Sequence, residues 1–174
     1  MRDTLETERL ILRPFKFSDA EEAFLNWTND PEVTKYVTWL PHENVAITQK
    51  IINFWIKEYE KPQTIRFGIT LKDGGALIGS IDVVDFINGK PEIGYCLSRK
   101  YWNHGYMTEA CKAVMDYIFS LGYDEILIRA QVENIGSNKV IQKCGFKFLY
   151  QENGPSSEVK PEIITVNYYS KKKA

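Results

Sequence analysis

The sequence predicts an α/β (α+β) fold in which helices flank one mixed, mostly antiparallel sheet of six or seven strands. Three observations predict it. Segments with alternating apolar residues, typical of half-buried strands, recur along the chain. Segments with apolar residues three and four positions apart, typical of amphipathic helices, lie between them. The hairpin signals Asp73-Gly74 and Asn88-Gly89 separate three consecutive strand segments, which makes those strands antiparallel.

The first third of the chain reads as one strand followed by helices. Ser18 is the expected N-cap of the first helix, because Glu21 three residues later completes a capping-box pattern. In the longest of these helices, Ile52, Trp55 and Ile56 recur at helical spacing. We expect a strand at residues 9–15 and helices at residues 18–27, 31–36 and 43–59.

Strands alternate with two helices in the rest of the chain. The clearest helix follows Gly105, where apolar residues keep helical spacing from Met107 to Leu121, and Gly122 ends the pattern. We expect this helix at residues 107–121, another at residues 137–144, and strands at residues 64–71, 76–86, 91–98, 126–132, 146–151 and 162–169.

The composition describes one globular domain, residues 1–174, with a sizeable core, since 44% of the 174 residues are hydrophobic. The 22 basic against 23 acidic residues give a net charge of −1, which excludes the basic footprint of a nucleic-acid binder. No stretch approaches the roughly 20 apolar residues of a membrane span. The first ten residues lack the apolar region of a secretory signal. The three cysteines, an odd number, fit a reduced compartment, so we expect a soluble, cytoplasmic protein.

The turn before the clearest helix has the chemistry of a phosphate site. Gly105 lacks a Cβ atom and lets a ligand approach the main chain closely. The N–H groups from His104 to Thr108 are the unpaired donors of a helix start, and they favour a diphosphate. The alternative is an ordinary strand-to-helix loop that happens to contain one glycine.

A second polar segment begins the next helix. Ser137 shares a helical face with the apolar residues Val140, Ile141 and Cys144, so it points inward. Asn134 lies where the preceding strand ends. The alternatives are that Asn134 is only an N-cap and that Ser137 is a satisfied polar group in the first turn.

Three stretches together resemble the GNAT superfamily of N-acetyltransferases, in particular its RimJ/RimL branch of ribosomal-protein alanine acetyltransferases. These stretches read LETERLILRPFKFSDAE, EIGYCLSRKYWNHGYMTEA and NIGSNKVIQKCGF, and the resemblance covers nearly the whole chain. It implies a GNAT-type fold, acetyl-CoA as cosubstrate and a primary amine as acceptor.

The resemblance also implies where acetyl-CoA binds. The pantetheine arm would pair like an extra strand with the main chain of Cys96, Leu97 and Ser98. Asn134 would hydrogen-bond the arm, and Asn138 would face the cofactor too. The pyrophosphate would lie on the turn formed by Asn103, His104, Gly105, Tyr106, Met107 and Thr108.

This turn departs from the family pattern at two positions. Asn103 replaces a glycine and Met107 replaces a small residue. Met107 is therefore expected to crowd the turn, while the binding of acetyl-CoA should survive because main-chain N–H groups hold the pyrophosphate.

The chemistry of acetyl transfer suggests the catalytic residues. Many relatives protonate the departing thiolate with a tyrosine four residues before the Gly-Phe pair, but this chain has Ile141 there. Ser137 is the remaining candidate donor, and the alternative is that it only contacts the pantetheine arm. A main-chain N–H of the Cys96–Ser98 segment would bind the oxyanion. Cys96 itself reads as a small strand residue and not as a nucleophile.

Glu92 is the candidate general base, acting directly or through water, because strand alternation places it on the face of Gly94 and Cys96. The alternative is a solvated carboxylate beside the Asn88-Gly89 turn. His42 and His104 are weaker candidates.

The acceptor is less defined. Tyr36, Trp39 and Leu40 either wall an acceptor pocket or belong to the core, and we expect no metal site. The acceptor is a protein N-terminus or a small amine such as a polyamine, an amino acid or an antibiotic. The rival hypotheses are a non-catalytic acyl-CoA-binding module and an unrelated phosphate- or nucleotide-binding domain. A monomer and a homodimer both fit the sequence.

Overall fold

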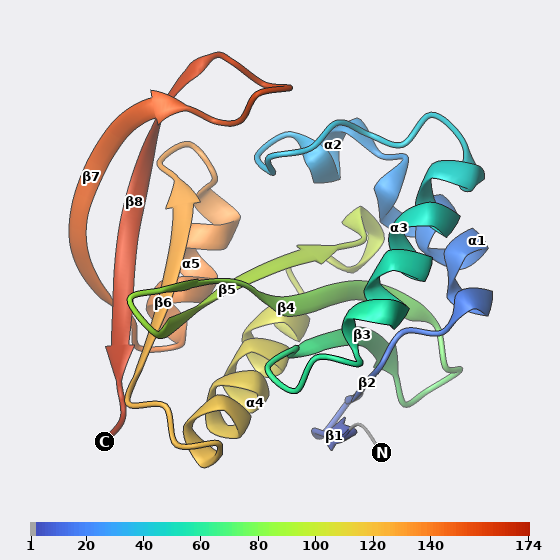
Figure 1. Ribbon diagram of the computed structural model, residues 1–174, viewed down its shortest axis with the longest axis horizontal. Helices are drawn as coiled ribbons and strands as arrows, with labels where there is room; N and C mark the ends of the chain where they lie inside the picture. The colour runs from blue at the N-terminus through green and yellow to red at the C-terminus, as the bar shows by residue number, and fades with distance from the viewer. Residues whose placement is uncertain (1–2) are drawn as a thin grey trace.

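The computed structural model, which describes residues 3–174, has one eight-stranded sheet with the strand order β1-β2-β3-β4-β5-β6-β8-β7 (Figure 1). Every neighbouring pair is antiparallel except β5 and β6, which run parallel. The strands are β1 (Leu5–Glu6), β2 (Leu10–Arg13), β3 (Arg66–Leu71), β4 (Leu77–Ile87), β5 (Lys90–Leu97), β6 (Glu125–Gln131), β7 (Lys147–Pro155) and β8 (Ile163–Lys172).

The helices cover both faces of this sheet. They are α1 (Ala20–Ala23), which continues from a 3₁₀ turn at Phe17–Asp19 into a π-helical turn at Phe24–Thr28, α2 (Pro31–Thr34), α3 (Val45–Glu58), α4 (Tyr106–Ser120) and α5 (Ile135–Lys143). One further 3₁₀ turn, Arg99–Tyr101, follows β5. The predicted mixed, mostly antiparallel α/β architecture is confirmed, and β1 is an additional short edge strand.

The start of the first helical segment differs from the prediction. Ser18 is exposed and does not cap the helix, because the helical turn already begins at Phe17 with Lys16 before it. Asp19 supplies the reciprocal bond instead, since its carboxylate accepts a hydrogen bond from the Lys16 N–H at 2.8 Å. The capping-box pattern is therefore present, but it is shifted by two residues.

Each face of the sheet has its own hydrophobic core. Helices α4 and α5 pack on one face, where Val114, Ile118 and Ile141 are fully buried. Helices α1 and α3 pack on the other face, around Trp27 and Ile52. Along β5, Ile93, Tyr95 and Leu97 face the first core, and Cys96 faces the second.

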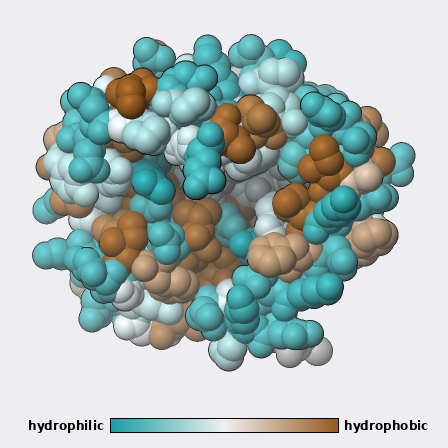
Figure 2. All heavy atoms as spheres, turned by 45° about the horizontal axis from the view of Figure 1, so that its top comes forward, coloured by the Kyte–Doolittle hydropathy of each residue, from teal (hydrophilic) through white to brown (hydrophobic). Residues whose placement is uncertain are grey.

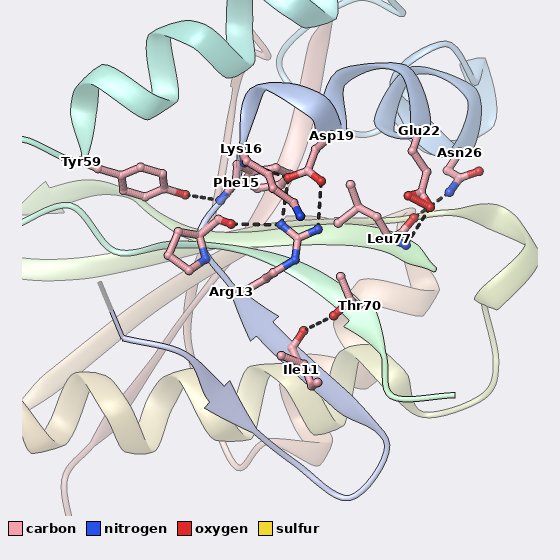
Figure 3. A network of polar contacts seen from close by, with 11 residues as sticks. Ile11, Arg13, Phe15, Lys16, Asp19, Glu22, Asn26, Tyr59, Thr70 and Leu77 are labelled. Atoms are coloured by element: carbon pink, nitrogen blue, oxygen red, sulfur yellow. Dashed lines mark hydrogen bonds and ion pairs between the residues drawn. The ribbon is translucent and has the colours of Figure 1, made fainter. Parts of the chain in front are cut away.

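Side chains of the first helical segment fix it to the start of β4, as Figure 3 shows. The Leu77 N–H donates to Glu22 at 3.2 Å, and the Leu77 carbonyl accepts from the amide of Asn26 at 2.6 Å. Nearby, the Arg13 guanidinium donates two hydrogen bonds of 2.9 Å to the Asp19 carboxylate. These contacts hold the α1 segment over the half of the sheet that contains β2 to β4.

The parallel strands β5 and β6 pair over only two positions, Glu92 with Leu127 and Ile93 with Ile128. Beyond these positions β5 continues to Leu97 and β6 to Gln131 without further pairing, and Figure 1 shows the strands diverging. The sheet therefore has a wedge-shaped opening at its centre. Within residues 3–174, no helix combines the length and apolar character needed to cross a lipid bilayer.

Candidate active site

The wedge exposes main-chain groups of β5. The Ser98 N–H donates to the Ile78 carbonyl of β4 at 2.7 Å. In an antiparallel pair, successive residues point their main-chain groups alternately toward the neighbouring strand and away from it. Ser98 and Cys96 therefore point toward β4, whereas Tyr95 and Leu97 point toward the wedge. An extended ligand arm could pair with these two residues as an added strand.

This orientation corrects part of the prediction for the pantetheine arm. Of the three residues expected to pair with it, only Leu97 has main-chain groups directed at the wedge, and Tyr95 is the neighbouring residue of β5 that shares this direction. The Leu97 carbonyl accepts a hydrogen bond from the indole of Trp102 at 2.8 Å. The Leu97 N–H is therefore the main-chain group of this residue that remains as a donor toward the opening.

The turn before α4 has the geometry of an anion cradle. Asn103 and Gly105 both have left-handed main chains, with φ of 61° and 79°. Glycine adopts this region freely, and asparagine tolerates it better than most residues, which explains how Asn103 replaces the family's glycine. Helix α4 begins at Tyr106, so the first N–H groups of the helix lack partners within it. This donor set fits a diphosphate.

Met107 does not crowd this turn, contrary to the prediction. Its side chain is buried in the core beneath α4 together with Ala110 and Val114. Because Met107 points away from the surface of the turn, its size does not restrict a ligand there.

A cleft of about 780 Å³ lies beside the wedge, and Figure 2 shows a hollow near the middle of this face with hydrophobic side chains inside it. The turn before α4 is not part of the cleft lining. The walls of the cleft come from α1, the α2–α3 region, β4, β5, β6, the start of α5 and the β7–β8 hairpin. The polar and aromatic lining residues include Trp27, Tyr36, Trp39, His42, Asp82, Asp85, Glu92, Tyr95, Cys96, Arg129, Asn134, Ser137, Glu152 and Tyr168.

Glu92 is a buried carboxylate in the wall of this cleft. Its side chain is 2% exposed, so the reading as a solvated carboxylate beside a turn is wrong. The Oε1 atom lies 3.3 Å from Nε of Arg129 but makes no hydrogen bond with suitable geometry. Burial raises the pKa of Glu92, Arg129 partly offsets that rise, and Asp85 adds to it. A carboxylate with a raised pKa and a free oxygen is suited to accept a proton.

Ser137 lies in the same cleft and is half-buried, with its Oγ atom 2.8 Å from the Oη atom of Tyr95. Burial is the main cause that raises the pKa of Tyr95, so the phenol keeps its proton. Sequence reasoning missed Tyr95. The alternation of β5 was the available signal, because it places Tyr95 opposite Glu92 and toward the helix that carries Ser137.

The two asparagines of the second polar segment differ in their bonding. The Asn134 side-chain oxygen accepts from the Ser137 N–H at 3.2 Å, so Asn134 is the N-cap of α5. The Asn138 amide donates to the carbonyls of Gln131 and Asn134, and its oxygen accepts from Asn167 and Tyr169. All four bonding positions of Asn138 are thus occupied. Its side chain is therefore held by the protein itself, and the expectation that Asn138 faces the cofactor stays a prediction.

The two histidines and Cys96 differ in their position relative to the cleft and in their protonation. His42 lines the cleft, 2.7 Å from the Thr48 hydroxyl, and burial lowers its pKa, so it is neutral. His104 is exposed outside the cleft, and its Nδ1 atom lies 2.7 Å from the Trp102 carbonyl. Burial raises the pKa of Cys96 to about 12, which keeps its thiol protonated.

The aromatic candidates for an acceptor pocket also divide. Tyr36 and Trp39 line the cleft, whereas Leu40 is exposed and does not. Among residues 3–174, no three histidine, cysteine, aspartate or glutamate side chains gather as they would around a metal ion.

The comparison with known proteins decides the family. The acetyltransferase (GNAT) domain family matches residues 9–147, which is most of the chain. The chain belongs to the GNAT family of acetyltransferases. The N-acetyltransferase p20 of Bacillus licheniformis, itself uncharacterized, is 35% identical over 148 residues, which are 83% of each chain.

Solved structures agree with this assignment. A GNAT-family acetyltransferase from Bacillus anthracis has a TM-score of 0.83 at 25% identity, and the match covers 98% of both chains. An acetyltransferase from Salmonella typhimurium that modifies the N-terminal serine of a 50S ribosomal subunit protein has a TM-score of 0.84 at 18% identity, over 99% of this chain and 100% of that chain. The latter shows likeness of fold alone. The predicted resemblance to the GNAT family is confirmed, and the proteins similar to this chain include ribosomal-protein acetyltransferases. This GNAT protein is an N-acetyltransferase that uses acetyl-CoA.

Proposed function

We propose that this GNAT protein acetylates a protein N-terminal amine by direct attack on acetyl-CoA in a ternary complex. One observation carries the proposal: Glu92 and the Ser137–Tyr95 hydroxyl pair line the same cleft. A candidate proton acceptor and a candidate proton donor therefore border one cavity. The reaction needs both, because the attacking nitrogen loses a proton and the departing sulfur gains one.

The amine nitrogen attacks the thioester carbonyl carbon, and Glu92 takes the proton that the nitrogen releases, directly or through one water. The Tyr95 N–H, which points into the wedge, donates to the carbonyl oxygen as negative charge develops there. The C–S bond then breaks, and the thiolate takes its proton from the Ser137 hydroxyl. The Tyr95 hydroxyl orients that serine, and solvent returns a proton to the serine.

An α-amine suits a weak base such as a carboxylate. With a pKa near 7.8 it is roughly 85% protonated at neutral pH, so a usable fraction is already neutral, whereas a lysine amine is almost fully protonated. The neighbour from Salmonella typhimurium modifies an N-terminal serine, which supports this acceptor class.

The shape and charge of the cleft bear on the acceptor as well. Lys160 of the β7–β8 hairpin donates to the carbonyls of Thr34 and Val37, and Ser157 donates to the Thr38 carbonyl at 2.7 Å. These bonds join the hairpin to the end of α2 and the segment after it, and so form a bridge between two walls of the cleft. The acceptor therefore enters as a slender chain, such as an extended N-terminal segment.

A small cationic amine is the second candidate, and the charge of the lining favours it. The carboxylates of Asp82, Asp85, Glu92 and Glu152 face the cleft, whereas Arg129 is its one lining lysine or arginine among residues 3–174. Aromatic walls next to carboxylates stabilise a cation such as a polyamine.

The experiment is a release assay for the CoA thiol with acetyl-CoA, a panel of N-terminal peptides, and polyamines, amino acids and aminoglycosides. We expect peptides to be acetylated on the α-amine, which mass spectrometry of the product locates. Faster acetylation of a small amine would favour the second candidate. Tight binding of CoA without any acetylated product would support the non-catalytic module instead.

A further inference from the structure

Arg9, immediately before β2, contacts both the turn that leads into α4 and the first turn of that helix. Its Nη1 atom donates to the His104 carbonyl at 2.9 Å, and its Nε atom donates to the Glu109 carboxylate at 2.7 Å. The centre of the guanidinium lies 4.3 Å from the centroid of the Tyr106 ring. One side chain from the β1–β2 connection thus spans the carbonyl side of the turn and the first turn of α4.

Glu109 anchors this arrangement from the helix. Its Oε1 atom accepts from the Arg9 N–H at 2.8 Å and from the Thr7 hydroxyl at 2.6 Å. Burial acts to raise the pKa of Glu109, but the hydrogen bonds from Thr7 and Arg9 outweigh it and lower the pKa, so the carboxylate stays charged. The β1–β2 connection, the turn and α4 are therefore joined into one unit.

The turn needs such support. Asn103, His104 and Gly105 are exposed, and two of the three have left-handed main chains. A loosely held turn of this kind would have to be ordered when a ligand binds, and that ordering reduces affinity. The carbonyl of His104, which Arg9 holds, belongs to the same peptide unit as the Gly105 N–H, so the contact sets the direction of a donor in the anion cradle.

We infer that Arg9 is a positioning residue for acetyl-CoA: it braces the turn of residues 103–108 so that its N–H groups are already aimed at the pyrophosphate. The inference rests on the proposed placement of the pyrophosphate on this turn. Glu109 already balances the charge of Arg9, so the contribution comes from the fixed shape of the guanidinium and not from its charge alone.

The test compares acetyl-CoA with acetyl-pantetheine, which carries the same thioester but no pyrophosphate. In Arg9→Gln and Arg9→Lys we expect kcat/KM for acetyl-CoA to fall about tenfold, as KM rises and kcat stays near the wild-type value. The kcat/KM for acetyl-pantetheine should stay unchanged, because that substrate does not reach the turn. In calorimetry, the Kd for CoA should rise in these variants, and the Kd for pantetheine should stay unchanged.

Arg13→Lys is the matched control. Arg13 lies on β2 and also forms a two-point ion pair, with Asp19, but it does not touch the turn. This variant should keep the wild-type ratio of the two thioester substrates even if it is less stable.

Two results would overturn the inference. One is a wild-type KM for acetyl-CoA in Arg9→Lys, and the other is an equal loss on both thioesters in Arg9→Gln, which leaves their ratio at the wild-type value. A wild-type protein that takes up no CoA would instead refute the proposed acetyl-CoA site itself, so the two failures are distinguishable.

Discussion

The Oγ atom of Ser137 and the Oη atom of Tyr95 lie 2.8 Å apart, which joins the first turn of α5 to β5 across the central opening of the sheet. Tyr95 contributes twice at this point, since its main chain faces the wedge and its phenol holds the serine. The serine hydroxyl is therefore oriented before any substrate arrives, and preorganised donors of this kind are effective in catalysis.

Ser137→Ala should lower kcat by about 100-fold, because the thiolate then departs without its proton donor. Tyr95→Phe should lower kcat less, since the serine remains but its hydroxyl is free to rotate. Steady-state release of the CoA thiol measures both. Ser120→Ala, at the far end of α4, is the control, and a wild-type kcat in Ser137→Ala would reject the assigned role.

Glu92→Gln should lower kcat/KM by about 100-fold or more and remove one acid limb from its pH profile. Burial raises the pKa of Glu92, so this limb lies above the ordinary range of a glutamate. Arg129 partly offsets that rise, so Arg129→Gln should move the limb to higher pH. A wild-type profile in Glu92→Gln would exclude Glu92 as the base.

Glu92→Gln should not lose stability at neutral pH. Because the pKa of Glu92 is higher in the folded than in the unfolded protein, the folded state binds more protons between the two values. The free energy of unfolding of the wild type therefore falls as pH rises through that window, and the glutamine escapes this loss. Thermal unfolding below and above the window measures the difference, and a variant less stable than wild type above it would contradict the expectation.

Gly105→Ala should weaken CoA binding, because φ of 79° strains any residue with a Cβ atom by about 1–2 kcal/mol. Gly74→Ala provides a matched comparison, since Gly74 has a φ of 80° in the β3–β4 hairpin. Both variants should lose similar stability, but only Gly105→Ala should raise the Kd for CoA in calorimetry. An equal Kd in the two variants would argue against the turn as the pyrophosphate site.

Asp19→Ala should destabilise the protein by about 2–4 kcal/mol, because it leaves a partly buried arginine without its carboxylate. Asp19 is 5% exposed and Arg13 is 25% exposed, so the cost is somewhat below that of a fully buried pair. Urea denaturation measures it. Glu6→Gln removes a partner of the exposed pair with Lys72 and should change stability little.

Lys160→Met should raise KM for the acceptor by about tenfold and leave KM for acetyl-CoA unchanged. The substitution keeps most of the length of the side chain but removes the bonds to Thr34 and Val37, so the bridge between two walls of the cleft loosens. Lys173→Met, which removes a single bond to the Phe119 carbonyl far from the cleft, is the control. Equal changes in the two KM values would contradict a role limited to the acceptor side.

Local patterns in the sequence predicted most of the architecture. The helix after Gly105, the antiparallel run from β3 to β5 and the N-cap at Asn134 follow from periodicity and turn chemistry, which act over a few residues. The edge strand β1 was missed because two residues carry no periodic signal. The cap at Ser18 was misplaced because Asp19, which Arg13 holds from β2, sets the start of that helix.

The site was predictable only where it depends on position within an element. Alternation along β5 placed Glu92 on the cleft side, and helical spacing turned Ser137 inward. The sequence alone does not specify which main-chain groups β4 already uses, so Cys96 and Ser98 were assigned to the wedge wrongly. Likewise, the pairing of Asn138 with Tyr169 joins residues 31 positions apart, which local patterns do not reveal.

The two-residue seam at which β5 pairs with β6 divides the sheet into two parts that share little main-chain hydrogen bonding. One part contains β1 to β5, and the other contains β6, β8 and β7. Acetyl-CoA inserted along Tyr95 and Leu97 would add hydrogen bonds between the two parts, so the bound substrate takes the place of an additional strand. We therefore expect the loaded protein to unfold as a more cooperative unit than the empty one, with the amide protons of both residues exchanging more slowly.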